Sequence, residues 1–327
     1  MTSARLCCAA IFSLALGCAS GQGEAKESPP ASVVSRPPAS PEVLRGERLF
    51  SEGKVGEAKR AFEQALADDP TDPRAWLDLG LVHEAKGDFG SAEAAYRRAT
   101  ELDQNFAEAY NNSGVLLRET GKLAEATTAL ERSVALDPDL TAARFNLALC
   151  YEELGKMADA EREYLATIED LPNDPVPRIN LAMMLIDLRR FDDAAAQLRL
   201  VRPMVRGDVL LSIAVGEGFR RAGLPDDAVS VLRPALEQAP EPPPTELLGE
   251  LSLAYYASGD LGSAEATMRR AVAQDELDPG LQYAYGSILA KQGQVGKARV
   301  HLRRAVSLDP GGPYAERARA RLESLKN

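Results

Sequence analysis

The sequence predicts an all-α protein assembled from eight copies of one helix-turn-helix unit. Alanines recur every 34 residues, the apolar residues between them follow the period of an α-helix, and a glycine divides most intervals in two. The recurring alanines are Ala58, Ala92, Ala126, Ala160, Ala194, Ala228, Ala264 and Ala298, with a two-residue insertion near Pro242–Pro244. A regular period of this length predicts a stack of similar units, because each unit buries its apolar residues against its neighbours.

The N-terminal segment has the pattern of a leader. An apolar run over residues 6–16 is shorter than the roughly 20 residues that cross a bilayer. The run leads into Leu16-Gly17-Cys18. This sequence resembles the lipobox of bacterial lipoprotein signal peptides, although Ala15 stands where that family usually has leucine. The resemblance implies a signal peptide of residues 1–17 and lipidation of Cys18. The alternative is an ordinary secretory signal, cleaved near residues 19–20, which would leave no lipid.

Residues 18–38 are rich in Pro, Ser, Gly and Ala and contain almost nothing that a folded core could bury. This composition predicts a disordered and partly extended tether. A lipidated cysteine followed by such a tether would hold the rest of the chain near a membrane. The alanine after the cysteine resembles the pattern of lipoproteins sent to the outer membrane. We therefore expect a lipid-anchored protein of the cell envelope, at the outer membrane and facing the periplasm.

The repeats occupy residues 39–312. In the clearest copy, Trp76, Gly80, Ala92 and Tyr96 have the spacing of the tetratricopeptide repeat (TPR), which this unit resembles. The resemblance implies a right-handed α-solenoid of eight TPR units. Their predicted bounds are 39–72, 73–106, 107–140, 141–174, 175–208, 209–242, 245–278 and 279–312.

The two helices of each unit are predicted to cross at small residues. One helix contributes a recurring alanine, and the other contributes a second small residue. The second small residues are Gly46, Gly80, Gly114, Ala148, Ala182, Gly216, Ser252 and Gly286. Any larger side chain would push the paired helices apart. A glycine is predicted to end the first helix in seven units, and Arg189 takes this place in the fifth unit.

The C-terminal segment, residues 313–327, is predicted to form one amphipathic helix. Its apolar residues fall on one side and its charged residues on the other. Repeat arrays need a terminal element with a polar outer side, because the last unit would otherwise expose its apolar face. We therefore expect a capping helix here.

The composition excludes several classes of function. A formal net charge of −11 argues against nucleic-acid binding, which requires clustered Lys and Arg. The two histidines, His83 and His301, do not have metal-ligand spacing, and Cys150 is the one cysteine beyond residue 18. No motif of nucleophilic catalysis is found. The sequence predicts a protein that is not an enzyme, with no cofactor, no metal and no small-molecule substrate.

Three asparagines suggest where a peptide would bind. Asn112, Asn146 and Asn180 occupy the same position in three consecutive units, on the helix that lines the concave groove in TPR proteins. Amide side chains spaced in this way could pair with successive peptide groups of an extended segment. The alternative is that asparagine is simply the usual residue of the family at this position.

An apolar stripe is predicted beside the asparagines in the groove. Its members are Phe145, Leu149, Ile179, Met183, Ile186, Leu210 and Ile213. Their positions usually face the groove and not the core. The alternative is that neighbouring repeats wind closely enough to bury part of the stripe. An exposed apolar patch of this size would mark a partner site.

The favoured function is a membrane-anchored scaffold of the bacterial cell envelope that binds a peptide or protein segment in its concave groove. In architecture it is similar to TPR lipoproteins that assist the assembly of pilus secretins or outer-membrane complexes. Two alternatives remain open. The chain could be a regulatory subunit of a cell-wall enzyme, or an intracellular TPR adaptor whose apolar N-terminus is not a leader.

Overall fold

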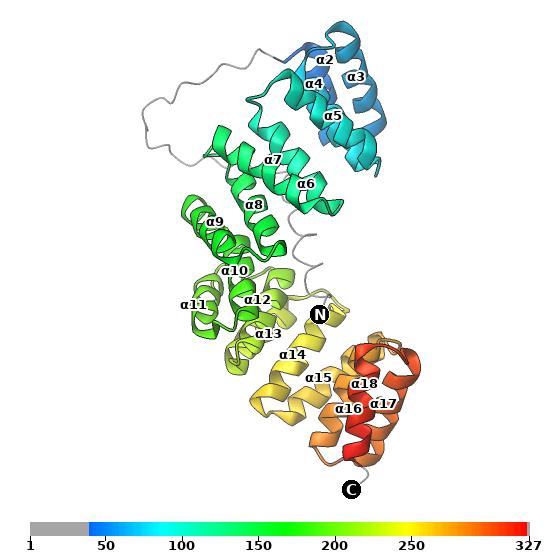
Figure 1. Cartoon of the computed structure of the whole chain (residues 1–327). Coiled ribbons are helices and arrows are strands. Elements are labelled where there is room, and N and C mark those ends of the chain that lie inside the picture. The colour runs from blue at the N-terminus through cyan, green and yellow to red at the C-terminus, as the bar shows by residue number, and fades with distance from the viewer. Residues whose placement is uncertain (1–38, 326–327) are drawn as a thin grey trace. The chain divides into compact units, whose positions relative to one another are not determined.

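The computed structural model describes residues 39–325 (Figure 1). All regular structure in this part of the chain is helical, which confirms the predicted all-α repeat fold. The expected signal peptide (1–17), the tether (18–38) and the last two residues of the cap lie outside the described residues. No helix between residues 39 and 325 has both the length and the hydropathy to cross a membrane.

The chain divides into two compact units, and the N-terminal one ends at Leu171. Within the described residues it consists of four helix pairs. These are α2 (Pro41–Ser51) with α3 (Val55–Asp68), α4 (Pro73–Ala85) with α5 (Phe89–Leu102), α6 (Ala107–Glu119) with α7 (Leu123–Leu136), and α8 (Thr141–Glu153) with α9 (Met157–Asp170). Each first helix packs mainly against the second helix of its own pair.

The C-terminal unit begins at Pro172, and its described residues contain four more pairs and a final helix. These are α10 (Pro175–Asp187) with α11 (Phe191–Val201), α12 (Val209–Arg221) with α13 (Pro225–Gln238), α14 (Thr245–Ser258) with α15 (Leu261–Gln274), α16 (Pro279–Lys291) with α17 (Val295–Leu308), and α18 (Pro313–Ser324). Helix α18 packs on α16 and α17, where Ala315 and Ala318 are fully buried. The predicted capping helix therefore covers the last pair.

A left-handed residue ends the first helix of every pair, as predicted. Seven of these residues are the predicted glycines: Gly53, Gly87, Gly121, Gly155, Gly223, Gly259 and Gly293, with φ between 73° and 93°. In the fifth repeat Arg189 adopts the same conformation, with φ 61°. Its N–H donates to the carbonyl of Ile186 at 2.9 Å, as that of Gly87 does to Glu84 at 2.8 Å. The turn therefore keeps its geometry without glycine, against the steric cost of a side chain in this region.

The small residues predicted at the helix crossings lie against large buried side chains. A Cβ atom added to Gly80 would lie 2.3 Å from Cε1 of Tyr96, and one added to Gly46 would lie 2.4 Å from Cε1 of Phe62. Real side chains do not approach so closely, so these positions accept only glycine in the present geometry. All eight recurring alanines are fully buried. The crossings are therefore as tight as the sequence predicts.

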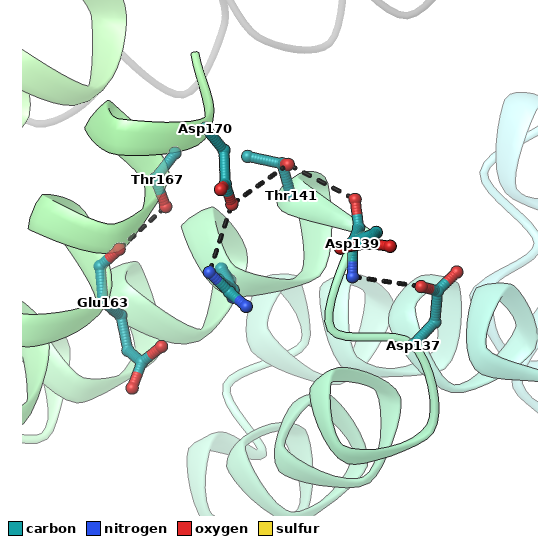
Figure 2. Close-up of polar contacts among 7 residues, drawn as sticks. Asp137, Asp139, Thr141, Glu163, Thr167 and Asp170 are labelled. Carbon is teal, nitrogen blue, oxygen red and sulfur yellow. Dashed lines mark hydrogen bonds and ion pairs between the residues drawn. The ribbon is translucent and has the colours of Figure 1, made fainter. Parts of the chain in front are cut away.

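Polar contacts close the fourth repeat, where the end of α9 meets the start of α8 (Figure 2). The carboxylate of Asp170 lies 3.1 Å from Nη1 of Arg144 and 3.5 Å from the hydroxyl of Thr141. Thr141 is the first residue of α8, so Asp170 also lies near the positive end of that helix. The preceding turn is held by the N–H of Asp139, which donates to Asp137 at 3.1 Å. These contacts fasten the last pair of the N-terminal unit.

We expect Gly80→Ala to destabilise the chain by about 1–3 kcal/mol, because Tyr96 is fully buried and cannot move away from the added methyl group. Gly90→Ala is the matched control. Nothing lies within 4 Å of a Cβ at Gly90 in α5, so this change should be neutral or stabilising by up to about 1 kcal/mol. Chemical denaturation measures both changes. Equal midpoints for Gly80→Ala and wild type would contradict the close crossing.

Candidate partner-binding surface

The first helices lie on the inner side of the stack within each unit. Helices α2 and α4, and likewise α6 and α8, contact each other in the N-terminal unit, and α10, α12, α14 and α16 do so in the C-terminal unit. Successive second helices make far fewer contacts. We call the side of the first helices that is turned away from the second helices the first-helix face. Its residues include Leu44, Asp78, Asn112 and Arg118 in one unit, and Met183, Leu210, Ile213, Glu217 and Tyr283 in the other.

The asparagines are less available than expected. Asn146 is only 6% exposed, and its amide donates to Oδ1 of Asn111 at 3.0 Å. The amide of Asn111 donates in turn to Oδ1 of Asn112 at 3.0 Å, so these side chains join α6 to α8. Asn180, on α10 in the C-terminal unit, is 8% exposed. The side chains of Asn146 and Asn180 therefore lie within the packed helices. Peptide binding by the three asparagines stays a prediction.

The expected apolar stripe is largely covered. Phe145 and Ile179 are each 2% exposed and Ile186 is 5% exposed, so the alternative of a buried stripe holds at these three positions. The ring of Phe145 lies 6.0 Å, centroid to centroid, from that of Tyr164 in the same repeat. Leu149 and Met183 are half-buried. The reason is the close packing of the first helices, which covers side chains that helical periodicity alone places on the outside.

Two exposed apolar side chains lie on the first-helix face, and one of them, Leu210, belongs to the predicted stripe. Leu44 on α2 is 54% exposed and Leu210 on α12 is 59% exposed. The half-buried Ile213 follows Leu210 by one turn. The sulfur of Met183 on α10 lies 3.6 Å from the place of a Cβ on Gly218, so Met183 extends toward α12. Leu210, Ile213 and Met183 form what we call the apolar patch of the C-terminal unit.

An ion-pair network lies on the same face of the C-terminal unit. Arg221 pairs with Asp187 at 2.5 Å and with Glu217 at 3.6 Å, which links α12 to α10. Arg220 makes two contacts with Glu250, at 2.8 Å and 3.2 Å, which link α12 to α14. Burial and the nearby carboxylate of Glu250 raise the pKa of Glu217. The network holds charged groups in fixed positions across three successive repeats.

The repeat spacing of the sequence also points to Glu250, which the three asparagines alone do not reveal. Glu250 occupies the repeat position of Asn180, once the insertion near Pro242–Pro244 is taken into account. The same position in the second repeat holds Asp78, whose Oδ2 is buried without a hydrogen-bond partner. Burial, together with the charge of Glu47, raises the pKa of Asp78 to about 7. The position therefore carries an acid or an amide in five repeats, and only the packing decides whether it is paired.

The other titratable groups of the described residues are held in local contacts. Within residues 39–325, no group of three or more His, Cys, Asp and Glu is arranged to hold a metal ion. Cys150 is buried and its pKa is raised to about 12, so its thiol stays protonated. His83 contacts Asp88 at 3.1 Å and His301 contacts Gln282 at 2.8 Å. These contacts fix both rings within their repeats.

Stacked helix pairs with small residues at every crossing define a helical repeat protein that binds partners through its surface. The sequence profile of the tetratricopeptide repeat matches residues 43–107, 83–141, 111–175 and 250–313, which together make up more than half of the chain. The chain therefore belongs to the tetratricopeptide repeat family, and the resemblance noted in the sequence is confirmed. Proteins of this family are generally interaction scaffolds and not enzymes. No curated protein matches the sequence.

Solved structures share the fold at low sequence identity. A TPR protein from Parabacteroides merdae has a TM-score of 0.57 at 19% identity, over 78% of this chain and 99% of that one. PilW, a widely conserved type IV pilus biogenesis factor, has a TM-score of 0.57 at 20% identity, over 64% and 96%. A chain of the APC/C hetero-tetramer Cut9–Hcn1 has a TM-score of 0.55 at 16% identity, over 88% of this chain. This chain spans 55% of that one.

We expect Asp78→Asn to stabilise the chain above neutral pH. The pKa of Asp78 is about 7 in the folded chain and 3.8 ordinarily, so the folded state binds the proton more tightly. Protonated Asp78 therefore stabilises the folded chain at low pH. This stabilisation is lost as the pH rises from 3.8 through about 7. At pH 8 the variant should gain roughly 1–4 kcal/mol. Denaturation at several pH values tests this. A gain that persists undiminished near pH 4 would contradict it.

Proposed function

We propose that this protein is a lipid-anchored scaffold of the bacterial cell envelope, which binds a segment of a partner protein on its first-helix face. The TPR fold supports a protein or peptide partner. The lipobox-like sequence at residues 15–18 and the Pro-rich segment after it support the anchor. The fold shared with PilW is compatible with a role in assembling an envelope complex such as a pilus secretin. A regulatory subunit of a cell-wall enzyme is the alternative.

The observation that carries the proposal is the apolar patch of the C-terminal unit. Leu210 is 59% exposed, although most large apolar side chains on the first helices are covered. Leu210 and Ile213 lie on the same helix, α12, as Arg220 and Arg221, whose ion pairs hold polar groups at the other end of that helix. An apolar centre with polar groups around it is the usual composition of a protein–protein interface. We infer that the partner places an apolar side chain against Leu210.

Photocrosslinking from the first-helix face tests the binding surface. A photoreactive amino acid in place of Leu210 should capture a partner in intact cells. The matched control is Val300 on the second helix α17, which is similarly exposed at 61%. Substitution there should capture nothing comparable. Capture from Val300 alone would make the second helices the binding surface, and capture from neither position would contradict the scaffold. Mass spectrometry of the product separates an assembly factor from a cell-wall enzyme.

The anchor has its own test. We expect Cys18→Ala to release the protein from the membrane fraction and to abolish incorporation of labelled palmitate, because the lipidated sulfur is lost. Circular dichroism should show unchanged helicity, since the repeats begin beyond residue 38. Cys8→Ala in the same leader is the control and should behave as wild type. A Cys18→Ala chain that stays in the membrane fraction would contradict lipid anchoring.

A further inference from the structure

The last repeat differs in charge from the rest of the chain. Between Pro279 and Leu308 there are five Lys or Arg residues and no Asp or Glu. Residues 39–278, in contrast, contain 44 acidic and 26 basic residues. Helices α16 and α17 therefore form a basic end on a strongly acidic protein. Such a segregation of charge creates a local attraction for anionic groups that the net charge of −11 conceals.

The cations on this part of the first-helix face have no carboxylate partners. In earlier repeats, Arg118 pairs with Glu153 at 3.2 Å and Arg220 pairs with Glu250 at 2.8 Å. Lys291 on α16 and the α18 residues Arg317 and Arg321 have no carboxylate within 4 Å among the described residues. The Nε atom of Arg321 is also buried without a hydrogen-bond partner. A partly desolvated and unpaired guanidinium attracts a carboxylate more strongly than a hydrated one.

Tyrosine rings accompany these cations. The rings of Tyr283 on α16 and Tyr314 on α18 lie 6.0 Å apart, centroid to centroid. The guanidinium of Arg317 lies 5.9 Å from the Tyr314 ring, and Nζ of Lys291 lies 4.4 Å from the ring of Tyr256 on α14. The rings position the cations without neutralising them. Tyr and Arg are also the residues that most often dominate the energetics of protein interfaces.

We propose that the first-helix face of α16 and α18, with Tyr256 of α14, binds an acidic segment of the partner protein. Carboxylates of that segment pair with Lys291, Arg317 and Arg321, and its backbone or apolar side chains lie against the tyrosine rings. This inference rests on the proposed scaffold function and assigns the chemistry of the partner. It also places the acid-binding surface at the C-terminal end of the array, beyond the apolar patch.

A short acidic segment fits this surface better than a larger polyanion does. Nucleic acid or an anionic membrane would also meet the neighbouring repeats, where acidic residues greatly outnumber basic ones, and would be repelled there. The cation–ring contacts of this end involve Lys291 and Arg317, whereas among the described residues none involves the exposed Lys297 or Arg303 on α17. The structure therefore favours carboxylates presented by a peptide.

Fluorescence anisotropy with the purified full-length chain tests the inference. The probe is a labelled, end-capped peptide of alternating Glu, Asp and Leu, and its control has Gln and Asn in place of the acids. The acidic peptide should bind at least about tenfold more tightly than the amide peptide, and added salt should weaken its binding. Lys291→Gln combined with Arg317→Gln should weaken binding by about tenfold or more. Both side chains are exposed, so the fold should be retained.

The matched control is Lys297→Gln combined with Arg303→Gln, which removes the same charge from exposed positions on α17. This pair should bind the acidic peptide within about twofold of wild type. Equal weakening by both pairs of substitutions would overturn the proposed site. It would mean that the overall positive charge of the last repeat attracts the peptide. Failure of the wild type to bind the acidic peptide would overturn the inference, as would binding only to phosphatidylglycerol vesicles or single-stranded DNA. The scaffold function would survive these outcomes if Leu210 still captures a partner.

Discussion

The close crossing of two helices at small residues is the constraint on which the whole structure depends. Where Gly80 meets Tyr96 and Gly46 meets Phe62, the backbone of one helix lies directly against a large buried ring of the other. Each ring belongs to its own local cluster of buried residues, so the core is a series of small cores and not one large one. The repeats therefore depend on regular spacing, and the rest of the surface is free to vary.

The charged groups on the surface are paired differently from one repeat to another. Asp78 and Glu250 occupy equivalent positions, yet one has a buried oxygen without a partner and the other forms two contacts with Arg220. A buried carboxyl whose pKa is raised lowers the stability of the folded chain at neutral pH. Proteins retain such groups most often where a binding function requires them.

The relationship to other TPR proteins follows from this division between crossings and surface. The solved structures are 16–20% identical to this chain and match 64–88% of its length. This similarity shows the fold alone. The family assignment therefore establishes an interaction scaffold, while the partner is determined by side chains that the fold leaves free. Leu210 and Tyr283 are among the side chains that differ from those at the same position of the other repeats.

The sequence by itself determined the helix pairs, their turns and the residues at their crossings. Even Arg189 was correctly placed in a turn, because these features depend on spacing within one repeat. Only the tertiary structure decided which first-helix side chains are covered, and Phe145 and Asn146 proved to be buried. Exposure there depends on how closely the next repeat packs. The ion pair between Arg220 and Glu250 likewise joins residues of different repeats. Helical periodicity describes one helix at a time, so it contains no information about these contacts.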